Sequence, residues 1–478
     1  MAEKYYTTIG LEIHAELKTQ TKMFCRCKND PDETRPNVNI CPVCMAHPGA
    51  LPVINKEAVR QVIRVGLAVD AKIAEDFTEF DRKNYFYPDI PKGYQISQYK
   101  YPIVSGGHLA DFDLTRIHLE EDTATSKHDR GDFSLVDFNR AGVPLMELVT
   151  EAHTFDSAEA AAAAAGRFAR EYQLLLWYLG ASEANMEKGE MRVEANISVS
   201  TDPKNWGTKV EVKNLNSVRS AERAIKYETA RMIELIEEGR GAEIIQETRG
   251  WDDGKQATFS QRKKESSHDY RYFPDPDLPK LVLKEVFDIP TLKSELPELP
   301  AAKRSRYKND FGIKDEDIES FINDPVLGKW FEDISAILKS PEKIKTASNY
   351  ITSDYLGLKK NNPNIAMPAA GHFAELIHMV TENKISSRAA KDILAMIVQG
   401  DASPMSIAES KDLLQKNDEG ALKEIAARIV AANPKVVETY KSGKENAIMS
   451  LVGQIMKETN GSANPQLAKQ ILVNLINS

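Results

Sequence analysis

The sequence predicts an α+β fold in which one large mixed domain is followed by two all-helical domains. Short strand-like runs, mixed with glycine, proline and polar motifs, fill the first part of the chain. Strand signals nearly vanish after a Glu-Leu-Pro-Glu-Leu-Pro stretch, and a second break follows later. We therefore expect domains at residues 1–292, 293–404 and 405–478.

Four runs in the first domain are rich in β-branched or aromatic residues, and several alternate polar with apolar positions, as strands do. They are Tyr6–Ile13, Leu114–Leu119, Val193–Val199 and Lys209–Lys213. Two helices are expected between and after them. Ser157 is a suitable N-cap for an alanine-rich helix that ends before Gly180, and a second helix should cover Val218–Glu238. The alanine run predicts a closely packed helix face.

The rest of the chain is predicted to be helical after a linker. Two prolines three residues apart, beside charges, favour an extended linker over residues 291–304. Residues 305–400 carry apolar positions at a spacing of three to four, which predicts consecutive helices. The Asp-Ala-Ser-Pro-Met break at 401–405 precedes a further helical stretch to residue 478.

Composition excludes several classes of protein. The 478 residues are 42% hydrophobic and 28% charged, which is ordinary for a globular chain and excludes a mostly disordered one. We find no apolar run long enough for a membrane helix and no signal-peptide core, so we expect a cytoplasmic protein without membrane partners. A net charge of −9 argues against non-specific coating of nucleic acid. The sequence has no GxxxxGK(S/T) loop, no GxGxxG after a strand and no GxSxG elbow, which excludes P-loop and Rossmann enzymes and common hydrolases.

Four cysteines form two pairs, Cys25-x-Cys27 and Cys41-x-x-Cys44, separated by 13 loop-like residues. Such pairs can converge tetrahedrally on zinc, and because all four ligands would be thiolates, the site would be closed and structural. The alternative is four reduced, unrelated cysteines.

Acidic residues recur on the predicted strands. Strand alternation would place Glu12, His14 and Glu16 on one face, which suits a divalent cation, although a solvated edge strand is the alternative. The run Glu120-Glu121-Asp122 is either a surface turn or the edge of a metal site. Glu211 and Lys213 would share one face of a further strand. Together these strands resemble the floor of a site for metal and phosphate.

Aromatic residues alternate with basic ones in two segments, Phe80–Asp89 and Asp269–Asp277. Arg and Lys suit phosphate contacts, and aromatic rings suit base or ribose stacking. The alternative is that both segments are aromatic-rich packing loops.

Several motifs resemble the GatB family, the B subunits of aspartyl/glutamyl-tRNA amidotransferases. They are Ile9–His14 (IGLEIH), Phe80–Asp89 (FDRKNYFYPD), Leu119–Asp122 (LEED), Leu135–Arg140 (LVDFNR), Gly207–Ser217 (GTKVEVKNLNS), Gln246–Arg249 (QETR), His268–Pro279 (HDYRYFPDPDLP) and Leu451–Lys457 (LVGQIMK). The resemblance extends from residue 5 to the C-terminus.

The resemblance implies a glutamine-synthetase-like cradle domain, a helical domain and a YqeY-like tRNA-binding tail. It implies a heterotrimer with GatA and GatC, in which GatA releases ammonia from glutamine. GatB itself would use ATP and Mg²⁺ to phosphorylate the side-chain carboxylate of Glu-tRNA(Gln) or Asp-tRNA(Asn) and then let ammonia displace phosphate. A glutamine-synthetase-like ligase for small molecules and a non-enzymatic tRNA-binding scaffold are the alternatives.

The resemblance also assigns residues. It implies that Glu12, His14, Glu121 and Glu211 bind Mg²⁺ and carry catalysis. It suggests Arg82, Lys83, Lys213 and Arg271 as contacts for phosphate or substrate, and zinc at the four cysteines as a structural ion. Many relatives carry Asp where this chain has Glu194, so the role of Glu194 stays open.

Overall fold

The computed structural model describes residues 4–127, 131–263, 270–400, 402–415, 419–459 and 463–477. The chain forms two compact units, Met1–Pro300 and Ala301–Ser478, and the division falls close to the predicted boundary at 292. The first unit mixes strands and helices and the second is helical, as the sequence predicts. His268, Asp269 and Asp401, which belong to the motif and the break noted above, lie outside the described residues.

The centre of the first unit is an eleven-stranded sheet with β1 (Tyr6–Glu16) in its middle. The path across it runs β15-β14-β13-β12-β1-β10-β7-β5-β2, with β11 added beside β1 and β6 beside β7. All pairings are antiparallel except that of β13 with β14. The other strands are β2 (Lys72–Ile73), β5 (Val104–Ser105), β6 (His108–Leu109), β7 (Phe112–Glu121), β10 (Pro144–Thr150), β11 (His153–Phe155), β12 (Met191–Ser200), β13 (Val210–Leu215), β14 (Glu247–Asp252) and β15 (Ala257–Lys263).

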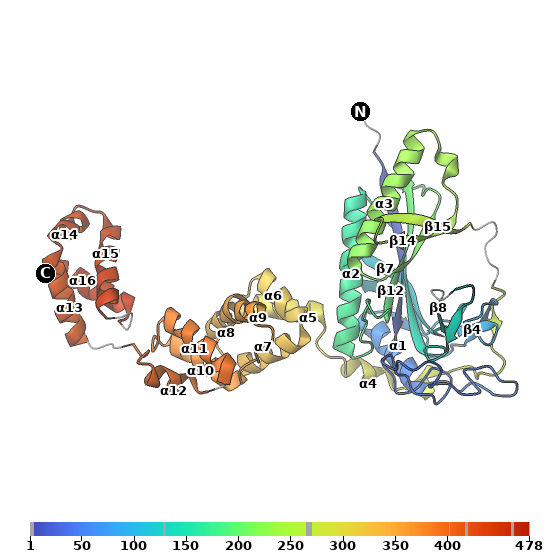
Figure 1. Cartoon of the computed structure of the whole chain (residues 1–478), viewed down its shortest axis with the longest axis horizontal. Helices are drawn as coiled ribbons and strands as arrows, with labels where there is room; N and C mark the ends of the chain where they lie inside the picture. The colour runs from blue at the N-terminus through green and yellow to red at the C-terminus, as the bar shows by residue number, and fades with distance from the viewer. Residues whose placement is uncertain are drawn as a thin grey trace. The chain divides into compact units, whose positions relative to one another are not determined.

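Alternation along the strands gives this sheet one apolar face, which helices cover. Figure 1 shows α2 (Ala158–Leu179) and α3 (Val218–Glu237) packed together along that face, with α1 (Lys56–Ala68) near one end. The predicted cap is confirmed, because Ser157 Oγ accepts from the Ala160 amide and Gly180 has a left-handed φ of 63°. Five alanines of α2 are buried in the same core as Ile9, Leu11 and Ile13, so the predicted close-packed helix face is confirmed; they are Ala161, Ala162, Ala164, Ala165 and Ala169.

Two smaller sheets complete the first unit. One pairs β3 (Asp81–Asn84) with β4 (Tyr94–Ser97) and β16 (Phe273–Pro274), and the other pairs β8 (Thr125–Lys127) with β9 (Leu135–Asp137). The first of them brings the two aromatic-basic segments of the sequence together, because Phe273 lies opposite Arg82. Both segments therefore contribute to one surface.

The predicted extended linker over 291–304 is wrong at both ends. Helix α4 covers Ile289–Ser294 and helix α5 begins at Pro300, so only residues 295–299 lie outside helices. Proline is tolerated in the first turn of a helix, where its missing N–H would have no partner, and Asp288 caps α4 by accepting from the Thr291 amide. The prolines therefore mark helix starts.

The second unit contains helices throughout its described residues. They are α5 (Pro300–Phe311), α6 (Asp315–Ile322), α7 (Pro325–Leu338), α8 (Pro341–Asn349), α9 (Leu356–Asn361), α10 (Ala370–Thr381), α11 (Ser387–Gly400), α12 (Pro404–Ser410), α13 (Glu419–Ala432), α14 (Pro434–Lys441), α15 (Ile448–Glu458) and α16 (Pro465–Asn477). The predicted boundary at 404/405 falls inside α12, which packs on α10 and α11. Helices α13, α15 and α16 share a separate apolar core, but the division of this unit into two domains stays a prediction.

Candidate active site

The face of the large sheet opposite α2 and α3 is polar, and the register of the strands decides which side chains meet there. On β1, Ile13 and Ala15 point into the core, so Glu12, His14 and Glu16 point the other way. Glu12 lies opposite Glu194 on β12, and His14 lies opposite Glu147 on β10. Glu12 and His14, which are two residues apart on β1, therefore contribute to two different groups of side chains.

The first of these, the three-carboxylate group, consists of Glu12, Glu194 and Glu211. One oxygen from each lies within 4.8 Å of the others. Lys213 Nζ donates to Glu194 at 2.8 Å and lies 3.3 Å from Glu211. Asn196 Nδ2 donates to Glu12 at 2.9 Å, and Thr248 Oγ1 donates to Glu211 at 2.9 Å. Burial raises the pKa of Glu12, and the carboxylates of Glu147, Glu194 and Glu211 raise it further.

The second, the His14 group, consists of His14, Glu120 and Glu147. The Glu147 carboxylate lies between two imidazoles, 3.3 Å from His14 Nε2 and 3.4 Å from His118 Nε2. Burial alone would lower the pKa of His14, but Glu147, Glu194 and Glu120 raise it to about 9. Burial would raise the pKa of Glu147, yet the two imidazoles hold it well below its ordinary value.

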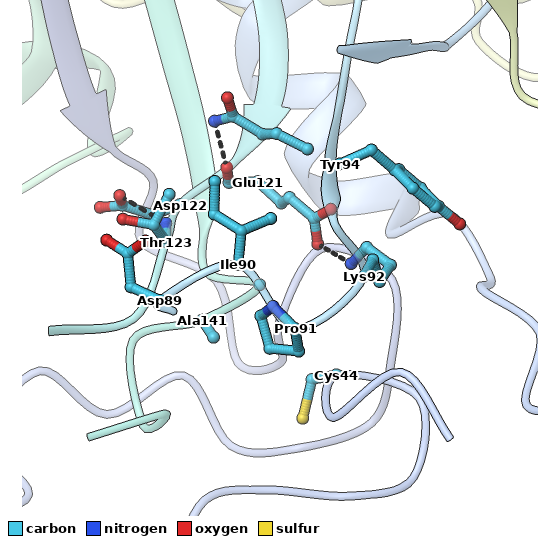
Figure 2. A pocket seen from close by; sticks show the side chains of 12 residues that line it. Cys44, Asp89, Ile90, Pro91, Lys92, Tyr94, Glu121, Asp122, Thr123 and Ala141 are labelled. Atoms are coloured by element: carbon cyan, nitrogen blue, oxygen red, sulfur yellow. Dashed lines mark hydrogen bonds and ion pairs between the residues drawn. The ribbon is translucent and has the colours of Figure 1, made fainter. Parts of the chain in front are cut away.

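Of the predicted coordination shell of Glu12, His14, Glu121 and Glu211, the structure brings Glu12 and Glu211 together, whereas His14 lies in the second group and Glu121 in neither. Glu121 follows Glu120 on β7, so its side chain points to the opposite face of the sheet. There its carboxylate accepts from Lys92 Nζ at 2.6 Å and from the Ile96 amide at 2.9 Å, and Figure 2 shows it turned toward Lys92. Glu120 takes the position beside His14 that the sequence had assigned to Glu121.

The four predicted phosphate or substrate contacts lie in different surroundings. Arg82 donates from Nε to Asp275 and from Nη2 to Asp277, both at 2.8 Å, so it links β3 to the segment after β16. Lys213 belongs beside the three-carboxylate group, as described above. Burial would lower the pKa of Lys83, but Glu120 and Glu147 raise it, which indicates that Lys83 lies beside the His14 group.

Arg271 is exposed and has a left-handed φ of 45°. It lines a cavity together with Tyr270 and Tyr272. Of the four predicted contacts, Lys83 and Lys213 are therefore the two that lie beside the acidic groups.

Sequence reasoning named Glu120 only as part of a candidate acidic run, gave no role to Glu147 or His118 and left the role of Glu194 open. A signal for two of them was present, because His118 and Glu120 are two apart on one strand and so share a face. Glu147 is a single acid inside an otherwise apolar strand, β10, and such an acid requires a partner when it is buried. Neither signal specifies which strand would lie opposite.

The four cysteine sulfurs converge, as predicted. All lie within 4.8 Å of one another, with Cys44 Sγ 3.8 Å from Cys41 Sγ and 3.9 Å from Cys27 Sγ. These distances exclude disulfides, and all four cysteines are free. The buried Lys22 ammonium lies 3.9 Å from Cys44 Sγ. A hydrogen bond with Cys25 is the main reason that the pKa of Cys44 is lowered to about 5, although burial opposes the shift, and Lys22 lowers it further. Cys44 therefore favours thiolate, the form that binds metal, whereas the hydrogen bond with Cys44 raises the pKa of Cys25 and burial raises that of Cys27.

The donor sets fit the ions that the sequence predicts. Four sulfurs suit zinc, and carboxylates with one imidazole suit a harder divalent cation such as Mg²⁺. Two buried oxygens beside the acidic groups, Glu120 Oε2 and Asn196 Oδ1, have no hydrogen-bond partner among the described residues. Buried oxygens of this kind are normally paired, so a cation or an ordered water fits both places.

The fold and the site define a class of protein: an α+β domain whose sheet carries two acidic groups that could each hold a cation, followed by helices. Comparison with known proteins gives the family. Residues 7–287 match the GatB/GatE catalytic domain and residues 329–476 match the GatB domain, so the chain belongs to the GatB family.

Curated relatives are similar over nearly their whole length. The chain is 42% identical to the B subunit of the aspartyl/glutamyl-tRNA(Asn/Gln) amidotransferase of Thermotoga maritima, covering 99% of both chains. It is 41% identical to the protein of the same name from Gloeothece citriformis, covering 98% of this chain and 97% of the relative. Within the part of the chain that the structure describes, no helix combines the length and apolarity needed to cross a membrane.

Proposed function

We propose that this chain is the activating subunit of a tRNA amidotransferase. It would use ATP and Mg²⁺ to phosphorylate the side-chain carboxylate of Glu-tRNA(Gln), Asp-tRNA(Asn) or both, and then let ammonia form the amide. The names of the relatives support an amidotransferase acting on these tRNAs. The observation that carries the proposal is the pair of acidic groups on one sheet face, with Lys83 and Lys213 beside them.

The residue types suit this chemistry. A carboxylate resists attack by ammonia because an oxide would have to leave, and phosphorylation supplies a better leaving group. The substrate carboxylate oxygen attacks the γ-phosphorus of ATP and ADP leaves. Ammonia then attacks the acyl carbon, inorganic phosphate leaves and a proton is lost, which gives the amide. Positioning and charge neutralisation dominate such transfers, and bound Mg²⁺ would neutralise the charge of the phosphates.

The chain's own residues would hold the reactants as follows. The three-carboxylate group and the His14 group would each hold a cation. Lys213 and Lys83 would bind phosphoryl or substrate oxygens from the two sides of the site. The acyl phosphate hydrolyses readily, so ammonia should reach it by a route sheltered from water.

The proposal includes partners. The chain would work in a heterotrimer with GatA and GatC, where GatA is the glutaminase that supplies ammonia. The first unit would be a glutamine-synthetase-like cradle, and the C-terminal helices would form a YqeY-like tail that contacts tRNA away from the reacting end. The complex would act in the cytoplasm.

The deciding experiment is tRNA-dependent ATP hydrolysis by the heterotrimer reconstituted with GatA and GatC. Glu211→Gln should lower it at least about 100-fold, because one cation ligand and its charge are lost. The glutaminase activity of GatA should remain. The variant should also weaken Mn²⁺ binding, measured by electron paramagnetic resonance without ATP or tRNA.

Two results of this experiment would favour the alternatives. ATP hydrolysis that small amino acids stimulate as well as Glu-tRNA does would favour a small-molecule ligase. ATP hydrolysis that neither stimulates, with tRNA binding intact, would favour a scaffold.

We also propose that the four cysteines hold structural zinc. Zinc bound by four thiolates contributes directly to folding free energy, so Cys41→Ser should lower the melting temperature of the complex by several degrees. Ala46→Ser, in the same loop, serves as the control and should melt like the wild type. Metal analysis of protein purified without chelator should give one zinc per chain, and protein without zinc would contradict the proposal.

A further inference from the structure

The motif Gln246–Arg249 (QETR) leads into strand β14, where successive side chains point to opposite faces of the large sheet. Thr248 lies opposite Glu211 in the parallel pairing of β13 with β14, so it shares the polar face with the three-carboxylate group. Glu247 and Arg249 point to the other face, where α3 lies. This short motif therefore joins the polar face of the sheet to the helix behind it.

On the polar face, Thr248 holds one oxygen of the Glu211 carboxylate. Its Oγ1 donates to Glu211 Oε2 at 2.9 Å, and both side chains are buried. The other oxygen, Oε1, lies 3.3 Å from Lys213 Nζ, which also donates to Glu194 at 2.8 Å. The terminal torsion of a glutamate is only weakly restricted, so a bond to one oxygen decides where the second one points. The hydroxyl of Thr248 therefore keeps Oε1 turned toward the rest of the three-carboxylate group.

On the opposite face, an ion network ties β14 to α3. Arg249 Nη1 donates to Glu247 at 2.6 Å, and its Nε lies 3.4 Å from the Glu228 carboxylate of α3. Glu228 is fully buried and also accepts from Arg231 Nε at 2.9 Å. Breaking a buried ion pair is costly, so these contacts resist displacement. The residues on either side of Thr248 are thus held from behind.

The pairing of β14 with β15 is irregular at the same point. Thr248 lies opposite Arg262 and Arg249 lies opposite Ser260, so Gln261 is an extra residue on β15. Such a β-bulge increases the local twist and re-aims a neighbouring side chain, and bulges are frequent beside functional sites. The irregular pairing and the ion network therefore both bear on the orientation of Thr248.

We propose that Thr248 is a positioning residue for Glu211: its hydroxyl holds the Glu211 carboxylate in the orientation that binds the cation of the three-carboxylate group. This inference rests on the proposed function for the presence of a cation there. Side chains that bond to a metal ligand without touching the metal commonly change metal affinity by about 10- to 100-fold. Thr248 occupies such a place, because it contacts a proposed ligand and lies on the neighbouring strand.

The test is Mn²⁺ binding by the full heterotrimer, measured by electron paramagnetic resonance without ATP or tRNA. Thr248→Val keeps the shape of the side chain and removes the hydroxyl, so it should weaken Mn²⁺ binding at the three-carboxylate group about tenfold. Thr248→Ser keeps the hydroxyl and should bind Mn²⁺ within about twofold of the wild type. Thr248→Ala also lacks the hydroxyl and replaces the valine variant if that variant does not fold.

A second readout separates affinity from turnover. In tRNA-dependent ATP hydrolysis, Thr248→Val should require about tenfold more Mg²⁺ for half of its maximal rate, whereas kcat at saturating Mg²⁺ should stay within about threefold of the wild type. A loss of folded protein would lower the maximal rate at every Mg²⁺ concentration instead. The shift in Mg²⁺ requirement is therefore specific to a positioning role.

Two controls show whether Thr248 acts through Glu211. Thr8→Val is the matched control, because Thr8 is a buried threonine of the same sheet whose Oγ1 lies 2.9 Å from Thr154 Oγ1. It removes a similar hydrogen bond away from the acidic groups and should leave Mn²⁺ affinity within about twofold of the wild type. In a Glu211→Gln background, Thr248→Val should change Mn²⁺ affinity by less than about twofold, because the ligand that it positions is already lost.

Three outcomes overturn the inference. The first is unchanged Mn²⁺ affinity in Thr248→Val while Glu211→Gln weakens binding, which would leave the cation site in place without a role for the hydroxyl. The second is an equal loss of affinity in Thr8→Val, and the third is an equal effect of Thr248→Val with and without Glu211→Gln. Weaker Mn²⁺ binding by Thr248→Val in a complex whose wild type lacks tRNA-dependent ATP hydrolysis would support Thr248 and reject the proposed function. If Glu211→Gln itself leaves Mn²⁺ binding unchanged, the proposed cation site and the role of Thr248 are both wrong.

Discussion

The two acidic groups on the polar sheet face differ in what balances their charge. The three-carboxylate group has an ammonium, Lys213, in contact with two of its members. The His14 group has imidazoles on both sides of Glu147, and that of His14 loses its proton as the pH rises through its pKa of about 9. One group therefore keeps a fixed counter-charge and the other has a counter-charge that can be removed.

This difference matters for cation binding. A cation at the three-carboxylate group competes with an ammonium that stays protonated, because Glu194 and Glu211 raise the pKa of Lys213 against the effect of burial. A cation at the His14 group needs the neutral imidazole, so binding there must release a proton from His14. Two residues of one strand, Glu12 and His14, thus belong to sites with different pH dependence.

The largest expected difference between the two groups is in how much the loss of one carboxylate lowers the free energy of unfolding. Glu147→Gln leaves the buried His118 imidazole and the partly buried His14 imidazole without the carboxylate between them, and breaking a buried ion pair in this way costs about 3–5 kcal/mol. Glu194→Gln removes one of three carboxylates that repel one another, while Lys213 keeps Glu211 as a partner. We expect it to cost about 1 kcal/mol or less, because relief of repulsion offsets the lost ion pair.

The measurement is urea unfolding of both variants at pH 7 without added divalent cation, with Glu183→Gln, an exposed surface change, as the control. Equal losses of unfolding free energy for the two variants would show that the groups have equivalent counter-charges. The proposed contrast between a fixed and a removable counter-charge would then be wrong.

The sequence predicted much of this arrangement but not which acids of β7 and β10 lie beside His14. Alternation placed Glu12 and His14 on a common face, and local composition identified the helix caps at Ser157 and Gly180. Assigning Glu121 to the site failed because adjacent acids on a strand point to opposite faces of the sheet. The run of three acids does not show whether Glu120 or Glu121 points to the polar face. Which strands lie beside β1 is set by non-local pairing, so Glu147 could not be assigned to His14.

The second difference concerns the dependence of stability on pH, which the His14 group should introduce. The folded-state pKa of His14, about 9, lies above its unfolded value near 6.5, so its interaction with Glu147 stabilises fully below about pH 6.5 and is lost as pH rises through 9. The pKa of Glu147 is lowered, so its contribution is present above its unfolded value of about 4.5 and is lost on acidification. Stability of the cation-free protein should therefore decline between about pH 6.5 and 9.

The affinity of the His14 group for a cation should rise with pH, whereas the stability of the cation-free protein falls. The carboxylates that face His14 are those of Glu147 on β10, Glu120 on β7 and Glu194 on β12. Because the imidazole must lose its proton, Mn²⁺ affinity of the Glu211→Gln variant, which retains the His14 group, should rise up to about tenfold per pH unit below pH 9. Calorimetry in two buffers of different ionisation enthalpy would count the released proton. Binding without proton release would mean that His14 is not a ligand.

The smallest expected effect isolates the fixed counter-charge. Lys213 Nζ contacts the carboxylates of Glu194 and Glu211, so a divalent cation must share these oxygens with it. Lys213→Met should therefore strengthen Mn²⁺ binding at the three-carboxylate group about tenfold, which corresponds to about 1.4 kcal/mol of relieved competition. The same variant should lose tRNA-dependent ATP hydrolysis, since the ammonium would no longer contact phosphate. Lys213→Arg keeps the charge and should leave the Mn²⁺ affinity within about threefold of wild type. Weaker Mn²⁺ binding by Lys213→Met would show instead that the ammonium holds the carboxylates in place for the cation, and the two groups would then differ in geometry more than in charge.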